Sequence, residues 1–217
     1  MTDPNISRRD FVRYAGFGLL ALSLPPVPAS LLERREYISD ALGFRFTIPV
    51  DWRWVSAVEI EAIRENTVLP GGDEAKHEVI EMAGTPLVVA TKFTYPKRGP
   101  TLVLWRQPVE DWHHSASDNE GFAKIHDCTY RDYKRYLKEC SVEHARPDLF
   151  AGLPASLCIT SFIEEDNRGG AWPVRIESHM FRWRQSWLTF NFLDLQTGWG
   201  AGARSDFANI EALFGPA

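Results

Sequence analysis

The chain has 217 residues, which suits one domain and a leader, and its hydrophobic content of 44% is ordinary for a globular protein with a sizeable core. Its formal net charge of -5 at pH 7 gives no electrostatic reason to expect nucleic acid or an anionic membrane as a partner. The composition therefore argues against a disordered chain and against a nucleic-acid-binding domain.

The N-terminus has the pattern of a twin-arginine export signal. Residues 7–13 read SRRDFVR, and the residues that fit the signal are Ser7, Arg8, Arg9 and Phe11. The apolar run at 14–24 is shorter than the roughly 20 residues that cross a bilayer and has the length of a signal-peptide core. We expect residues 1–29 to be a signal peptide that engages the twin-arginine translocase, which leaves a periplasmic or secreted protein without a stable membrane span. An ordinary amphipathic N-terminal helix is the alternative.

After a linker at 30–42, hydrophobic periodicity predicts the elements of the domain. Strands are expected at 44–48, 87–94, 101–107, 155–164, 174–184 and 186–194, and helices at 56–66, 74–83, 120–139 and 205–214. The strands at 87–94 and 101–107 have apolar residues on both faces, which favours a sheet that is covered on both sides. The last two strands form a tight hairpin, and Ser205 is the expected N-cap of the final helix. These elements predict a single α+β domain.

The three cysteines are Cys128, Cys140 and Cys158. On a continuous helix, Cys128 and Cys140 would lie about 18 Å apart at a rise of about 1.5 Å per residue, too far for a disulfide. A disulfide between Cys140 and Cys158 and a set of unpaired buried thiols remain as alternatives. The spacing fits no zinc pattern.

The densest group of metal-ligand residue types is Asp111, His113 and His114, in a polar stretch at 108–119. Adjacent histidines point apart in an extended chain, so an exposed polar loop is the alternative to a metal site. The sequence has no nucleophile elbow, no P-loop and no dinucleotide fingerprint. We therefore expect no catalytic residues and no cofactor, because packing accounts for the apolar residues.

Four tryptophans fall in the last third of the chain: Trp172, Trp183, Trp187 and Trp199. One interpretation is core packing and cross-strand pairing in the hairpin. The other is that Trp172 and Trp199, both in glycine-rich stretches, are exposed and anchor a partner, since interfaces favour Trp, Tyr and Arg. The turn at 95–100 would then lie beside them.

Three stretches of the sequence resemble the PsbP-like domain family. They are GFRFTIPVDW at 43–52, TPLVVATKFTYPKRGPTLVLW at 85–105 and GLPASLCITSF at 152–162. The resemblance covers residues 43–214 and implies a single antiparallel sheet between helical layers, an α/β/α sandwich. The family includes an extrinsic subunit of the photosynthetic oxygen-evolving complex and a Ran-binding import factor, so the resemblance implies binding or assembly rather than catalysis. The matching positions shape strands and turns, so no functional residue of the family is carried over.

These observations favour an exported, non-catalytic domain that binds another protein as an accessory or assembly factor. A small-ligand or metal-binding periplasmic protein and a hydrolase with an unfamiliar site are the alternatives. Nucleic acid is not an expected partner.

Overall fold

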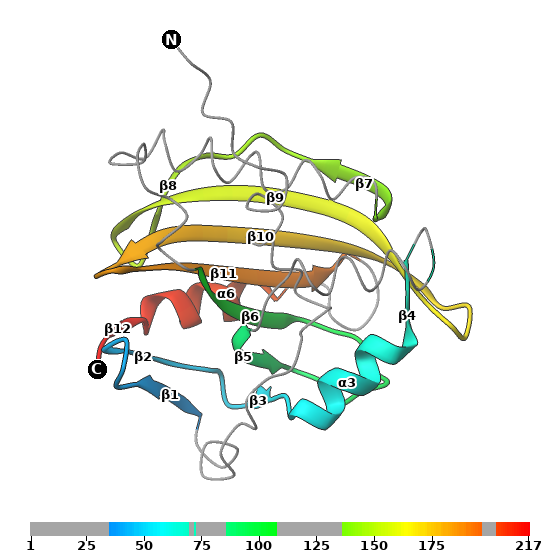
Figure 1. Cartoon of the computed structure of the whole chain (residues 1–217), viewed down its shortest axis with the longest axis horizontal. Coiled ribbons are helices and arrows are strands. Elements are labelled where there is room, and N and C mark those ends of the chain that lie inside the picture. The colour runs from blue at the N-terminus through cyan, green and yellow to red at the C-terminus, as the bar shows by residue number, and fades with distance from the viewer. Residues whose placement is uncertain (1–34, 70–71, 73–85, 108–135, 197–202) are drawn as a thin grey trace.

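The computed structural model describes residues 35–69, 72, 86–107, 136–196 and 203–217 (Figure 1). In chain order its elements are β1 (Glu36–Ser39), β2 (Phe44–Thr47), β3 (Arg53–Trp54), α3 (Ala57–Asn66), β4 (Thr67–Val68), β5 (Pro86–Thr91), β6 (Thr101–Gln107), β7 (Lys138–Val142), β8 (Arg146–Phe150), β9 (Leu153–Asp166), β10 (Ala171–Trp183), β11 (Ser186–Leu195), α6 (Arg204–Ala212) and β12 (Gly215–Pro216). Neither described helix is long and apolar enough to cross a membrane.

Nine of the described strands form one antiparallel sheet, with the long strands β9, β10 and β11 side by side (Figure 1). The order is β3-β5-β6-β11-β10-β9-β4, and β7 and β8 also pair with β9. Strand β11 lies near the middle and is buried along almost its whole length, although four of its ten residues are polar. A second sheet has three strands in the order β1-β2-β12, so segments from the two ends of the described chain pair with each other.

Alternate residues of the large sheet contribute to two hydrophobic cores, one on each face. The α3-side core includes Val55, Ile60, Val89, Val103, Trp105, Phe162, Val174 and Leu193. The α6-side core includes Phe44, Phe46, Phe150, Phe181, Phe190, Phe192, Phe207 and Phe214. The prediction of a sheet covered on both faces is confirmed. The predicted helical layers are only partly present, because the α6-side cover consists of α6 together with the three-stranded sheet.

Aromatic rings dominate the α6-side core. Phe150 stacks on Phe181 with ring centroids 4.7 Å apart, and Phe192 contacts Phe207 of α6 at 4.8 Å. Such pairs contribute about 0.5–1.5 kcal/mol each beyond the area they bury. Phe207 and Ile210 lie one turn apart on α6, so both side chains dock on the same face of the sheet.

All six predicted strands and two of the four predicted helices are confirmed, most of them with shifted ends. The hairpin of β10 and β11 turns at Arg184, which adopts φ 53°, as the tight connection requires. The helix α6 begins one residue early, and its N-cap is Ala203 rather than Ser205. The carbonyl of Ala203 accepts the N–H of Phe207 at 3.1 Å, which places Ser205 inside the first turn.

Two predicted segments differ from the structure. The helix predicted at 120–139 lies mostly outside the described residues, but its last two residues belong to β7. Glu139 has φ 52°, a left-handed conformation that a continuing helix does not allow. Part of the predicted linker at 30–42 forms β1, which pairs with β2 along four residues. The helix predicted at 74–83 lies outside the described residues.

Candidate functional site

A pocket lies on the α3 side of the large sheet, between α3, the turn at 93–99 and strands β9, β10 and β11. We call it the α3 pocket. Part of its lining is apolar and includes Val55, Ile60, Val89, Val174, Leu193 and Leu195. Its charged lining residues are Glu59, Lys97, Arg98, Glu164 and Asp194. The cavity offers about 50 Å³ to the centres of water-sized molecules, which is room for several waters or a small organic group.

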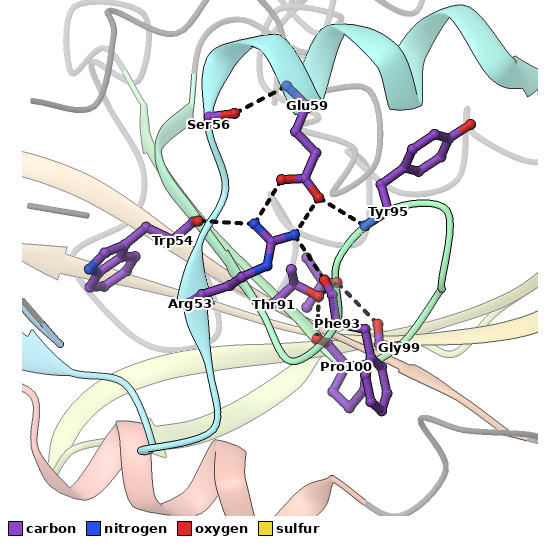
Figure 2. Close-up of polar contacts among 10 residues, drawn as sticks. Arg53, Trp54, Ser56, Glu59, Thr91, Phe93, Tyr95, Gly99 and Pro100 are labelled. Atoms are coloured by element: carbon purple, nitrogen blue, oxygen red, sulfur yellow. Dashed lines mark hydrogen bonds and ion pairs between the residues drawn. The ribbon is translucent and has the colours of Figure 1, made fainter. Parts of the chain in front are cut away.

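An ion pair between Arg53 of β3 and Glu59 of α3 fixes one wall of the α3 pocket (Figure 2). Arg53 Nη1 donates to Glu59 Oε2 at 2.7 Å, and Nη2 donates to Oε1. Arg53 also donates to the carbonyl of Phe93 at 3.0 Å, and the N–H of Tyr95 donates to Glu59 at 2.9 Å. Strand β3, helix α3 and the turn at 93–99 are therefore tied together at this point.

The start of α3 explains why Glu59 is placed there. Ser56 Oγ accepts the N–H of Glu59 at 3.3 Å, which is an N-cap contact. The Ser-x-x-Glu spacing is that of a capping box, in which the glutamate normally turns back to the cap. Here the carboxylate contacts Arg53 and Tyr95 instead. Burial by itself would raise the pKa of Glu59, but the hydrogen bonds from Arg53 and Tyr95 outweigh it and hold the pKa below its usual value.

A buried ion pair between Arg98 and Glu164 lies among the charged lining residues. Arg98 Nη1 is 2.8 Å from Glu164 Oε1, and the two side chains are 8% and 4% exposed. The guanidinium carbon also lies 5.7 Å from the ring centroid of Tyr95 and 5.4 Å from that of Trp172. The strand register contributes to this arrangement, because Trp172 of β10 is directly opposite Glu164 of β9.

The pair is close but poorly aligned. Its 2.8 Å distance is that of an ion pair, yet among the described residues neither Nη1 nor Nη2 of Arg98 has an aligned hydrogen-bond acceptor. We therefore treat the contact as Coulombic, with guanidinium N–H groups still available as donors. Burial raises the pKa of Glu164; the attraction of Arg98 opposes this rise, and the repulsion of Asp166 adds to it.

One buried acid, Glu164, and two partly buried acids, Glu59 and Asp194, thus line the pocket, which the sequence analysis did not expect. The described lining nevertheless contains no serine, cysteine or histidine. The Thr91 hydroxyl donates to the Pro100 carbonyl and accepts from Thr101, so both threonines have partners within the hairpin. The described residues therefore supply charges, aromatic rings and an apolar surface to the pocket.

The structure places Trp172 differently from the predicted exposed anchor. Strand β10 begins at Ala171, three residues before the predicted strand, and carries Trp172 into the sheet. Its ring is half-buried, packs against the α3-side core and supports Arg98. The expectation of an exposed anchor therefore does not hold for Trp172. The other candidates lie outside the described residues: Ser7, Arg8, Arg9, Phe11, Asp111, His113, His114, Cys128 and Trp199.

Cys140 and Cys158 do not form a disulfide with each other. Cys140 lies in β7 rather than on a helix, and β7 pairs with β9, which holds Cys158. Because Val142 is opposite Thr160, Cys140 and Cys158 are offset by about four residues, or roughly 13 Å at the rise of a strand. That offset exceeds the Cα separation of about 7 Å that a disulfide tolerates.

The sequence analysis also missed a buried histidine. His179 of β10 lies in the α6-side core, with its ring 5.4 Å from that of Phe150 and 5.8 Å from that of Phe192. Its Nδ1 is 3.7 Å from Asp148 Oδ2, which is too long for a hydrogen bond. Burial lowers the pKa of His179 although Asp148, Glu211 and Glu177 act in the opposite direction.

Comparisons with known proteins find only distant likenesses. No family model matches the chain, and no curated protein matches it. A solved structure from Bacteroides thetaiotaomicron aligns with 85% of this chain at 9% identity and a TM-score of 0.45, and this chain covers 49% of that longer protein.

Three other solved structures align over most of both chains. Cyanobacterial PsbP from Synechocystis is 12% identical, with a TM-score of 0.46 over 84% of this chain and 91% of that one. The Saccharomyces cerevisiae Ran-binding protein Mog1p is 11% identical, with a TM-score of 0.44 over 85% and 96%. LpqN of Mycobacterium tuberculosis, involved in cell envelope biogenesis, is 12% identical, with a TM-score of 0.41 over 88% and 97%. At these identities and TM-scores none of the likenesses bears on function.

Proposed function

We propose that this chain is an exported, non-catalytic binding protein, acting as an accessory or assembly factor, and that the α3 pocket is its recognition site. The observation that supports this most is the buried Arg98, whose guanidinium lies over the rings of Tyr95 and Trp172 beside an apolar cavity. Arginine, tyrosine and tryptophan are the residues enriched at the centres of binding sites. Lys97 is exposed at the same turn, so a partner can approach from there.

Site-specific cross-linking tests the proposal in intact cells. A photo-reactive residue placed at Lys97 should capture one discrete protein partner. The same residue at Leu213 serves as the matched control, because Leu213 is 56% exposed and follows α6, which covers the opposite face of the sheet. Identical products at both positions, or none at Lys97, would contradict recognition at the α3 pocket.

A second candidate function is the binding of a free small molecule. The apolar lining and the cavity of about 50 Å³ favour it, since small-ligand sites are concave and mostly apolar with a few polar groups. A small-molecule extract of the periplasm should then raise the melting temperature of the protein by mass action. If the pocket instead binds a group that belongs to a partner protein, this extract should leave the melting temperature unchanged.

Export through the twin-arginine pathway and a metal site at Asp111, His113 and His114 remain separate proposals. The sequence pattern at 7–13 supports the first. The second would be supported by stoichiometric zinc, copper or manganese in protein purified without a tag, and a metal-free preparation that keeps its fold would count against it.

A further inference from the structure

We infer that the charged part of the α3 pocket binds a carboxylate on a short aliphatic stem. The inference deepens the proposed function and rests on it, because it names the chemical group that the pocket receives. It follows from the state of Arg98, from the acids around it and from the apolar lining.

Within the described part of the chain, the unsatisfied hydrogen-bond donors of Arg98 are the first reason to expect a ligand. It is 93% buried, since its exposed fraction is 7%, and it lines the cavity. Among the described residues, its Nη1 and Nη2 atoms are buried and have no aligned acceptor. A buried guanidinium is costly unless its N–H groups are hydrogen-bonded, and it cannot lose its proton to escape that cost. The planar fork of an arginine matches the two oxygens of a carboxylate, so this ligand uses both atoms at once.

The acids of the pocket leave room for such a ligand. Both carboxylate oxygens of Glu59 accept hydrogen bonds from Arg53, and Oε1 also accepts the Tyr95 N–H, so Glu59 does not compete for Arg98. Glu164 contacts Arg98 through one oxygen without good alignment, and its burial disfavours the ionised form. Asp194 also lines the pocket and repels an anion, so the ligand must gain more from Arg98 than it loses to Asp194 and Glu164.

The apolar lining sets the size and shape of the ligand. Ile60 of α3 and Leu193 of β11 belong to the buried core and also line the cavity. A cavity of about 50 Å³ for water-sized centres accommodates a stem of a few carbon atoms beside the charged group. Isobutyrate and the side chain of a glutamate are therefore suitable probes.

Calorimetric titration of the full-length wild-type protein tests the inference directly. Isobutyrate should bind about tenfold more tightly than its neutral isostere isobutyramide, and isobutylamine should not bind. Equal binding of acid and amide, tighter binding of the amine, or no binding of any probe would overturn the inference.

The same titration distinguishes a free carboxylate from one that a partner protein presents. N-acetyl-glutamate N-methylamide carries the carboxylate in a peptide context, and N-acetyl-glutamine N-methylamide is its neutral control. Tighter binding of the glutamate compound than of isobutyrate assigns the group to a protein partner, and the reverse order assigns it to a free ligand. Both results support carboxylate recognition, provided that the neutral control binds about tenfold more weakly.

Two variants with matched surface controls locate the contact. Arg98→Gln should abolish isobutyrate binding, whereas Arg45→Gln makes the same charge change at an exposed ion pair and should leave binding unaltered. Glu164→Gln removes the competing carboxylate and should tighten binding about tenfold, whereas Glu36→Gln should not. Unchanged binding in both Arg98→Gln and Glu164→Gln would overturn the inference, and the wild-type comparison of acid with amide decides the matter if either variant fails to fold.

The outcome is separable from that of the proposed function. If cross-linking at Lys97 captures a partner but no carboxylate binds, the inferred ligand class is wrong and the recognition site stands. If cross-linking fails while isobutyrate binds, the chain is a small-ligand binder. Failure of both contradicts the proposed function itself.

Discussion

The buried pair of Arg98 and Glu164 makes an asymmetric prediction about stability. The raised pKa of Glu164 means that the folded protein is more stable when this side chain is neutral, so Glu164→Gln, which resembles the protonated form, should not lower the free energy of unfolding at pH 7.5. Arg98→Met removes the attraction that opposes the burial cost of the Glu164 carboxylate, so the free energy of unfolding should fall by about 3–5 kcal/mol at pH 7.5 and by less at pH 5, where a proton can neutralise the carboxylate. Replacing both residues by Arg98→Met and Glu164→Leu should cost less than Arg98→Met alone, because no buried charge is left.

The pH dependence follows from the raised pKa of Glu164. Because the folded protein holds this proton more tightly than the unfolded chain does, the stabilisation is fully present below about pH 4.5, the usual value, and is lost as pH rises through the folded pKa. This single group changes the free energy of unfolding by at most about 1.4 kcal/mol per pH unit. Urea unfolding at pH 5 and 7.5, followed by tryptophan fluorescence, measures all three variants. A loss of about 3 kcal/mol or more for Glu164→Gln at pH 7.5 would show that the buried pair needs the ionised carboxylate and would refute the reasoning.

Three further changes have defined outcomes. Glu59→Gln should lower the free energy of unfolding by about 1.5–3 kcal/mol at pH 7 and by less at pH 3. The reason is the lowered pKa of Glu59, because the stabilisation from its ionised form is lost as pH falls below about 4.5. An equal loss at both pH values in urea unfolding would be contrary evidence. The lowered pKa of His179 predicts that wild type loses stability as pH falls below about 6.5, and His179→Phe should remove this loss. If the melting temperatures of wild type and variant fall equally between pH 7.5 and 5.5, His179 is not the cause. Replacing Arg8 and Arg9 by lysine should retain the precursor in the cytoplasm, as measured by cell fractionation, whereas unaltered export would reject the twin-arginine assignment.

The sequence predicts those strands whose own residues show an apolar pattern. Strands β5, β6, β9, β10 and β11 carry recurring apolar residues, and each falls close to its predicted place. Strands β7 and β8, with the sequences KECSV and RPDLF, have no such pattern and become strands because they pair with β9. The family resemblance stays a prediction, although a cyanobacterial PsbP is among the solved structures that align with the chain.

The candidate site was less predictable because its residues meet through distant contacts. Arg98 lies in a segment that reads as a turn, and its burial depends on Glu164 and Trp172, more than sixty residues further along the chain. One feature of the sequence could have indicated the buried ion pair. The alternation of β9 places Glu164 on the same face as Phe162 of the α3-side core, and an acid on a core face requires a partner.

The pairing of β12 with β2 sets the order in which this molecule can be completed during synthesis. Phe44 and Phe46 are translated early, but their cover includes Phe207, Ile210 and Phe214, and Gly215 pairs with Arg45. The ribosome must therefore release the last of these residues before the aromatic centre is shielded from water. If residues 1–29 are an export signal for folded proteins, they leave the ribosome long before the domain that follows them can fold completely.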